Sequence, residues 1–262
     1  MASIKVAVNG AAGKMGRETV GAICREPDLE PVGAVDQVPG DRLDLPDGSG
    51  TVPLYTSLEG LLEDVSPHVL VDFTRAEVTM AAVPVAARHG INLVIGTSGL
   101  TQQNLEEMER VAQEGNVGIF VAPNFALGAV LLMHMAKQLA PFFDYADIIE
   151  MHHEAKIDAP SGTSIAMAQA IAKDRQFKRN RPQKETLPGT IGGEFDGVGI
   201  HSVRMPGRSA HHEVIFGTAG QTLSLRHDAL GRDCYMPGVV RAIREVVNLK
   251  GLVVGLDKIL GL

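Results

Sequence analysis

The sequence comprises 262 residues, of which 45% are hydrophobic, and it carries a formal net charge of -7. This is enough apolar material for one large domain or two smaller ones, and the acidic balance argues against nucleic-acid binding, which usually needs a basic face. Cys24 and Cys234 lie far apart without metal-ligand spacing, so we expect no disulfide framework, no zinc site and a reducing cytoplasm. Without a run of about 18 apolar residues, we expect neither export nor membrane insertion.

The first half alternates short apolar runs with helical patterns. Ser57 and Thr101 are typical helix start signals. Near-continuous apolar strands joined by helices are typical of a parallel sheet covered on both faces, so a doubly wound α/β domain is predicted. The predicted strands span residues 4–9, 29–35, 68–73, 91–96 and 117–122.

The second half changes character. Three strand patterns follow one another without intervening helices, which predicts a mixed or antiparallel sheet in a second, α+β domain. A polar stretch that includes residues 173–184 precedes them and is expected to be a solvated, mobile loop. The predicted elements are a helix over 126–140, a strand over 147–152, a helix over 161–173, strands over 199–205, 212–217 and 222–228, and a helix over 235–247 with a tail over 251–260.

The helix over 235–247 and the tail are expected to return to the first domain. The predicted boundaries therefore assign 1–124 and 234–262 to one domain and 125–233 to the other.

A glycine-rich turn joins the first strand to a helix. Gly10, Gly13 and Gly16 form G-x-x-G-x-x-G, in which the first glycine stands one residue earlier than in the common dinucleotide fingerprint. Glycines there let backbone N–H groups approach a pyrophosphate at the helix N-terminus. A plain strand-to-helix turn is the alternative, but Asp36, twenty residues after Gly16, suits adenosine ribose hydroxyls. The pattern predicts a Rossmann-type dinucleotide site.

The residues after the second strand indicate whether the cofactor carries a 2′-phosphate. The carboxylate of Asp36 would repel a 2′-phosphate, and Gln37 brings no positive charge. This favours NADH. Arg42 follows in the same loop and could reach a phosphate, so NADPH use stays possible.

Residues 150–164 read "EMHHEAKIDAPSGTS". Successive strand side chains face opposite ways, so His152 and His153 cannot share a metal unless the strand has ended, and no persuasive ligand set surrounds them. Lys156 supplies a cation, and Ser161 can cap a helix whose N-terminal N–H groups bind anions. The alternative is a surface loop with a helix cap. We favour proton chemistry beside a carboxylate site, with no metal.

Six motifs together resemble the bacterial dihydrodipicolinate reductase family, over essentially the whole chain. The resemblance implies reduction of a cyclic dicarboxylate, 4-hydroxy-tetrahydrodipicolinate, by NAD(P)H in the diaminopimelate route to lysine. It also implies a homotetramer assembled through the sheet of the second domain. The motifs are "GAAGKMG", "VDFTRAE", "VIGTSG", "APNFALG", "EMHHEAKIDAPSGT" and "HSVRMPGRSAHHEVIFG".

The resemblance assigns roles residue by residue. Its catalytic, proton-handling residues correspond to His152 and Lys156, and its substrate-binding residues to His153, Lys156, Gly162 and Thr163. Family members often have Glu then Arg where this chain has Asp36 and Gln37, and another small residue at Pro123. Its cofactor-binding residues correspond to Gly10, Ala11, Ala12, Gly13, Lys14, Met15, Asp36, Arg75, Gly96, Thr97, Ser98, Ala122, Pro123, Asn124 and Phe125.

Three questions stay open at the level of sequence. Either His152 or Lys156 could protonate the ring, and the strand residues His211, His212 and His227 could serve subunit contacts or catalysis. A reductase of another small carboxylate and a non-catalytic dinucleotide sensor are the alternative functions. The first would not need the His-His-Lys loop, and the second would not need a proton donor.

Overall fold

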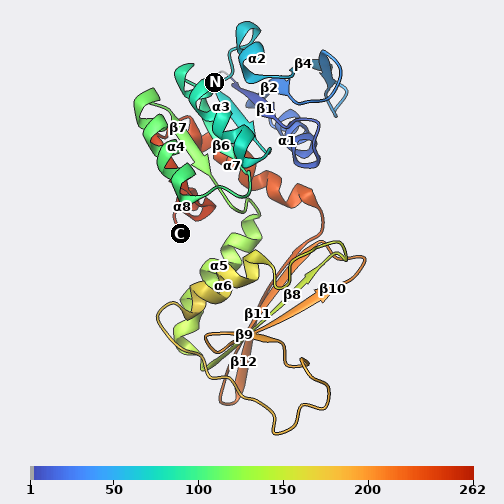
Figure 1. Ribbon diagram of the computed structural model, residues 1–262, viewed down its shortest axis with the longest axis vertical. Helices are drawn as coiled ribbons and strands as arrows, with labels where there is room; N and C mark the ends of the chain where they lie inside the picture. Colours follow the sequence, from blue (N-terminus) through green and yellow to red (C-terminus); the bar gives the residue numbers. More distant parts are fainter. Residues whose placement is uncertain (1–2) are drawn as a thin grey trace. The chain divides into compact units, whose positions relative to one another are not determined.

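The computed structural model describes residues 3–262, and the chain divides into two compact units (Figure 1). Unit 1 comprises Met1–Leu127 and Arg232–Leu262, and unit 2 comprises Gly128–Gly231. The sequence-based boundaries, after residues 124 and 233, lie close to these divisions. No helix of the described chain is long and apolar enough to cross a membrane.

Unit 1 contains an eight-stranded sheet in the order β13-β7-β6-β5-β1-β2-β4-β3, parallel except at β3. The predicted doubly wound arrangement is confirmed, and the C-terminal tail contributes β13 beside β7. The strands are β1 (Ile4–Asn9), β2 (Leu29–Val35), β3 (Arg42–Asp44), β4 (Thr51–Tyr55), β5 (Val69–Asp72), β6 (Asn92–Ile95), β7 (Gly118–Val121) and β13 (Gly251–Val254).

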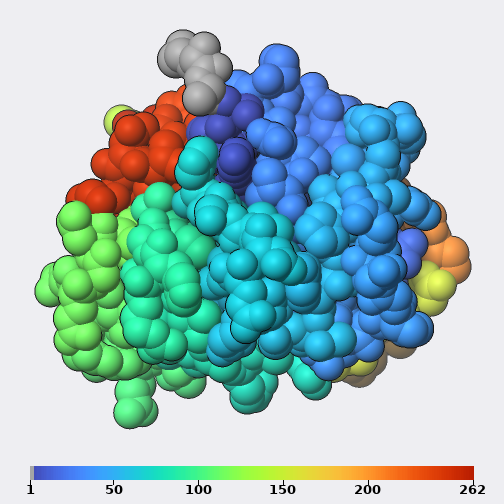
Figure 2. Space-filling view, turned by 90° about the horizontal axis from the view of Figure 1, so that it is seen from above, coloured from blue at the N-terminus to red at the C-terminus, as the bar shows by residue number. Residues whose placement is uncertain are grey.

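The helices of unit 1 begin where the sequence indicates. The Ser57 hydroxyl accepts a hydrogen bond from Gly60 N at 3.2 Å, and Thr101 and Asn104 form a reciprocal capping box. Figure 2 shows α2, α3 and α4 following one another across one face, from light blue through cyan to green. The helices are α1 (Lys14–Arg25), α2 (Leu58–Asp64), α3 (Ala76–Arg88), α4 (Gln102–Gly115), α7 (Met236–Val246) and α8 (Leu256–Leu260), with a 3-10 turn at Arg232–Tyr235.

Strands β3 and β4 were not predicted. Strand β3 is only three residues long and lies antiparallel to β4, whose central residue is Pro53. Strand β3 is too short to show a periodic pattern, and the central proline of β4 argues against a strand there. Together they extend the sheet beyond β2 and give Arg42 a fixed backbone position.

Unit 2 is built on a five-stranded mixed sheet in the order β12-β11-β8-β10-β9, as expected for an α+β domain. Strands β8 and β10 are parallel, and the other pairs are antiparallel. The elements are α5 (Leu127–Leu139), a 3-10 turn at Ala140–Phe142, β8 (Tyr145–His152), α6 (Gly162–Ala172), β9 (Gly193–Phe195), β10 (Val198–Arg204), β11 (Ala210–Thr218) and β12 (Gln221–Ala229).

The two faces of strand β8 differ. Ala146, Ile148, Glu150 and His152 are buried, and the residues between them are half-buried. The apolar members belong to a core with helices α5 and α6, which lie on one side of the sheet in Figure 1. Because side chains alternate along a strand, Glu150 and His152 point to the same face at the end of the strand that leads into the His-Lys loop.

The polar stretch before β9 is anchored to this sheet. Phe177 is 3% exposed in the core, and Arg179 donates to Asp147 on β8 at 2.6 Å. The expectation of a solvated loop over 173–184 is wrong at these two residues. One aromatic residue among many polar ones gives little periodic signal.

Candidate active site

The glycine turn in unit 1 has the geometry of a pyrophosphate cradle. Gly10 has φ +79°, and a Cβ on Gly16 would lie 2.0 Å from Gly10 O, so the turn requires glycine at both positions. Helix α1 begins at Lys14, and its N-cap, Gly13, offers no side chain to occupy the first N–H groups. Ala11 is buried beneath the turn, while Gly13 and Lys14 are exposed. These residues fit a phosphate at the helix N-terminus.

Asp36 lies beside this turn at the end of β2. Its carboxylate accepts hydrogen bonds from Ala12 N at 2.8 Å and from Gln37 N at 2.7 Å. Asp36 lines a cavity of about 670 Å³ together with Gly10, Gly13 and Arg75. This cavity within unit 1 joins the phosphate turn to an acceptor for ribose hydroxyls, which is the combination a dinucleotide needs.

Arg42 is held away from that cavity. Its guanidinium donates to the hydroxyl and the carbonyl oxygen of Thr51 on the adjacent strand. It lines a separate cavity of about 740 Å³. Among the described residues that line the cavity of Asp36, Arg75 is the one cation.

The loops after β6 and β7 bring together the other predicted cofactor residues. A Cβ on Gly96 would lie 2.1 Å from the ring of Phe73, so the loop passes close to that ring. Thr97 is 6% exposed, and its hydroxyl donates to Asp72 at 2.9 Å. Ser98 is exposed. After β7, Ala122 and Phe125 are buried, Asn124 is half-buried and Pro123 is exposed.

Asp72 was missed by the sequence analysis. Its carboxylate is fully buried at the end of β5 and accepts from Asn9 at 2.8 Å, Thr79 at 2.9 Å and Thr97 at 2.9 Å, as well as from Thr74. These donors come from the ends of β1 and β6 and from helix α3 and its preceding loop. The network therefore holds the loops of the dinucleotide site in register with one another.

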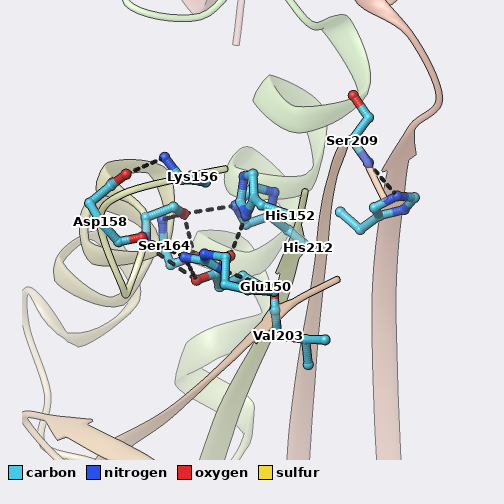
Figure 3. Close-up of polar contacts among 11 residues, drawn as sticks. Glu150, His152, Lys156, Asp158, Ser164, Val203, Ser209 and His212 are labelled. Atoms are coloured by element: carbon cyan, nitrogen blue, oxygen red, sulfur yellow. Dashed lines mark hydrogen bonds and ion pairs between the residues drawn. The ribbon is translucent and has the colours of Figure 1, made fainter. Parts of the chain in front are cut away.

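In unit 2, His152 is the last residue of β8 and is 7% exposed. Its Nδ1 donates to Glu150 Oε2, because an ionised carboxylate can only accept. This contact leaves Nε2 as the other ring nitrogen that can donate or accept a hydrogen bond. Arg204 donates to both carboxylate oxygens of Glu150, at 2.7 and 3.0 Å. Figure 3 shows Glu150 and His152 side by side, with His212 next to them.

The environment shifts the pKa of both partners. Burial lowers the pKa of His152, Glu150 opposes this, and Lys156 and Arg204 add to the lowering. Burial would raise the pKa of Glu150, but hydrogen bonds from Arg204, Ser202 and His152 outweigh it and lower that pKa. Glu150 is therefore a carboxylate at neutral pH beside a histidine that loses its proton more easily than usual.

Lys156 lies in the loop after β8. Its ammonium donates to Asp158 at 2.6 Å (Figure 3), and this contact holds the pKa of the Asp158 carboxyl below its usual value. His153 is exposed. Both residues belong to a segment that carries cationic and hydrogen-bonding groups at the surface of unit 2.

Helix α6 starts directly after this loop. Ser161 is its N-cap and accepts from Ser164 N at 3.2 Å, as the sequence predicted. A Cβ on Gly162 would meet nothing within 4 Å, so space lies open at the first turn. Gly162 and Thr163 present their N–H groups there beside the loop of Lys156, and such groups favour an anion.

Three further histidines lie on β11 and β12. The ring of His212 meets the ring of His152 edge-on, with centroids 5.4 Å apart, and its Nε2 is 3.2 Å from the hydroxyl of Ser161. Burial lowers the pKa of His212 to about 4, so it is neutral at physiological pH. His227 packs against Gly128 of α5, and His211 is bonded to Asp228 at 2.6 Å. Of the three, His212 adjoins the loop between β8 and α6, residues 153–161 (the reactive loop), since it contacts His152 and Ser161.

The site favours acid-base and anion chemistry. No group of three or more His, Cys, Asp or Glu side chains with metal-binding geometry occurs among residues 3–262. One short segment of unit 2 instead contains His152, Lys156, Gly162 and Thr163. In unit 1 the glycine turn consists of Gly10 to Met15, and the cavity beside it is lined by Asp36 and Arg75. Glu150 and Arg204 are the residues that sequence reasoning missed in unit 2, although the i, i+2 spacing of Glu150 and His152 indicated a shared face. For His212, which the sequence left between subunit contacts and catalysis, the structure shows a position beside His152.

The chain matches two family descriptions in tandem: "Dihydrodipicolinate reductase, N-terminus" over residues 4–125 and "Dihydrodipicolinate reductase, C-terminus" over residues 128–260. It is 51% identical to a 4-hydroxy-tetrahydrodipicolinate reductase of Dehalococcoides mccartyi, with 100% of each chain covered. It is 41% identical to the enzyme of that name from Listeria welshimeri, covering 98% of this chain and 100% of the relative.

A solved structure is also similar: dipicolinate-bound dihydrodipicolinate reductase from Paenisporosarcina sp. TG-14 has a TM-score of 0.87 and 39% identity, with 98% of this chain and 99% of that chain covered. These matches extend over both units of the chain. The chain belongs to the dihydrodipicolinate reductase family.

Proposed function

We propose that this protein reduces 4-hydroxy-tetrahydrodipicolinate to tetrahydrodipicolinate with a reduced pyridine nucleotide, releasing water and the oxidised nucleotide, in the diaminopimelate route to lysine. The observation that carries the proposal is the segment 150–164, in which a carboxylate-bound histidine, an ammonium group and a helix N-terminus occur together. The family relationship over both units supports it. A biosynthetic reductase of this kind works in the cytoplasm, where we expect this protein.

In unit 1 the glycine turn and Asp36 hold the nucleotide. The N–H groups at the start of α1 bind the pyrophosphate, Asp36 accepts from the adenosine ribose, and Arg75 supplies a cation in the same cavity. The residues of the loops after β6 and β7 contact the nicotinamide end. When bound, the cofactor supplies a hydride to the ring of the substrate. The remaining cofactor contacts are Gly96, Thr97, Ser98, Ala122, Pro123, Asn124 and Phe125.

In unit 2 the loop binds a substrate with two carboxylates. The ammonium of Lys156 exchanges its contact with Asp158 for one with a substrate carboxylate, because both are anions and the side chain of Asp158 is 48% exposed to water. His153 and the N–H groups of Gly162 and Thr163 complete the anion site at the start of α6. Holding both carboxylates orients the ring for reduction.

The proton for the neighbouring ring atom comes from Nε2 of His152. Nδ1 is occupied by Glu150, so Nε2 is the exchangeable position. Lys156 anchors the substrate, and its ammonium stabilises negative charge that develops on the ring. Lys156 is the alternative proton donor if turnover does not depend on His152.

The alternative functions fit the site less well. A dinucleotide sensor does not require a buried Glu150–His152 pair, because it transfers no proton. A reductase of a simpler carboxylate does not require cationic and N–H groups for two carboxylates. The direct test is an assay with freshly made synthase product, following oxidation of NADH and NADPH separately. Binding of NADH without turnover on that product would favour the sensor.

NADH is expected to be preferred over NADPH by roughly tenfold in kcat/KM, or about 1.4 kcal/mol. The reason is the negative charge of Asp36 beside neutral Gln37, whose amide donates to the carbonyl of Thr56 at 2.6 Å. Replacing Gln37 by arginine should raise kcat/KM for NADPH by about tenfold, because a guanidinium pairs well with a phosphate. The same coupled assay measures both.

Arg42→Ala is the matched control for this prediction. Arg42 is bound to Thr51 and lies outside the cavity of Asp36, so its removal should leave the cofactor preference unchanged. A wild-type enzyme that prefers NADPH and loses that preference in Arg42→Ala would show that Arg42 governs the choice.

We also propose a homotetramer assembled through the sheet of unit 2. Helices α5 and α6 cover one face, but on the other face Ile149, Met151, Val203 and Ile215 are only half-buried although they lie on central strands. Oligomers commonly bury such a patch against its own copy. Sedimentation or light scattering should give four times the monomer mass, and Met151→Asp should lower it. A wild-type monomer would contradict the proposal.

A further inference from the structure

Glu150 is a buried carboxylate whose hydrogen bonds join strand β10, through Arg204, to His152 and Ser161. It is 0% exposed, and its partners include His152 Nδ1, the two terminal nitrogens of Arg204, and Ser161 N at 3.3 Å. A carboxylate in such a position costs free energy unless its hydrogen bonds are complete. Its partners therefore account for its ionised state.

We propose that Glu150, kept ionised by Arg204, is a positioning residue for the proton transfer: it holds His152 as the Nδ1–H tautomer, directs Nε2 to the substrate, and favours the protonated ring. This inference rests on the proposed role of His152. Glu150 itself touches no reacting atom, since it is fully buried beneath the histidine.

Arg204 connects Glu150 and His152 to the reactive loop. Besides its two bonds to Glu150, it donates to the carbonyl of Asp158 at 2.6 Å. Strands β8 and β10 run parallel with Arg204 opposite His152, and Met205 N donates to His152 O at 3.1 Å. The guanidinium thus fixes the carboxylate under His152 and the backbone beside Lys156 at the same time.

The charges that face His152 determine the direction of the pH effect. Glu150 from β8 stabilises the imidazolium, whereas Lys156 from the loop and Arg204 from β10 destabilise it. His212 from β11 is neutral above its pKa of about 4 and adds no charge at working pH. Glu150 is therefore the one anion among these neighbours, and removing its charge must lower the pKa of His152 further below its usual range.

Removing the charge of Glu150 should shift the pH dependence of the rate toward acid. A histidine acid is active while protonated, so the rate falls as pH rises through its pKa. In Glu150→Gln the alkaline limb of the kcat/KM profile should move to lower pH by about one unit, which is roughly a tenfold loss at a fixed pH on that limb. The Kd for NADH should stay at the wild-type value, because the nucleotide binds in unit 1.

A second variant distinguishes loss of the Glu150 charge from misfolding. Glu150→Gln alone leaves the guanidinium of Arg204 without its partner, so Glu150→Gln/Arg204→Gln removes both charges and keeps similar volume. Asp147→Asn is the matched control: Asp147 lies on the same strand and also bonds an arginine and a histidine, Arg179 and His201, but faces the other side of the sheet. Its profile should match wild type.

The decisive readouts are the pH profile and the ¹⁵N chemical shifts of the His152 ring, assigned by comparison with His152→Gln. We expect the Nδ1–H tautomer in wild type and Asp147→Asn, and a mixture or the Nε2–H tautomer in the charge-free double variant. Wild-type tautomer and pH profile in both Glu150 variants would overturn the inference. Loss of the tautomer without any effect of His152→Gln on turnover would instead refute the proposed role of His152.

Discussion

Lys156→Ala is expected to lower kcat/KM for the cyclic dicarboxylate by about two to four orders of magnitude. The ammonium both anchors a carboxylate and stabilises charge developing on the ring, so kcat should fall and KM should rise together. The Kd for NADH should barely change, because the glycine turn and Asp36 belong to unit 1. Steady-state kinetics with fresh substrate and a fluorescence titration with NADH measure the two effects separately.

The chain offers a matched lysine for comparison. Lys178 also pairs with an aspartate in unit 2, Asp144 at 3.0 Å, but it is well exposed and follows helix α6. Lys178→Ala should keep the wild-type kcat/KM. A Lys156→Ala enzyme with wild-type kcat/KM would remove this residue from the site.

His152→Gln should lower kcat by about two to three orders of magnitude, as expected for loss of a positioned acid. The pKa of His152 is lowered mainly by burial, so wild-type activity should be full in acid and decline as pH rises through that pKa. Glutamine does not titrate in this pH range and cannot act as the acid, so kcat of the variant should no longer depend on pH in this way. The measurement is kcat against pH for both enzymes.

His201→Gln is the corresponding control. His201 also bonds a carboxylate on β8, Asp147 at 2.8 Å, but on the opposite face of the sheet. Its kcat and pH profile should be those of wild type. If His152→Gln keeps a near-wild-type kcat with the same pH dependence, the proton comes from Lys156 or from water.

Much of the architecture was predictable because it rests on local patterns. The observed bounds of β1 and β2 equal the predicted ranges 4–9 and 29–35, since each is a run of apolar residues with clear punctuation. Ser57, Thr101 and Ser161 cap their helices as predicted. Periodicity, capping residues and glycine turns act over a few residues, so a single sequence carries them.

The parts that could not be predicted depend on contacts distant in sequence. Arg204 meets Glu150 across 54 positions, and no local pattern joins them. Asn9 meets Asp72 across 63 positions. Arg42 was expected to be able to reach a phosphate beside Asp36, but pairing of β3 with β4 directs its guanidinium to Thr51. These arrangements arise only when the strands are packed side by side.

The most direct test of the proposed chemistry follows the C4 hydrogen of NADH into the product. NADH carrying deuterium at one of the two C4 positions is incubated with the protein and fresh synthase product, and the product is analysed by mass spectrometry. One deuterium should enter the ring from one of the two labelled isomers, and in D₂O a second deuterium should enter from the solvent. NADH binding with no deuterium in the product from either isomer would contradict it.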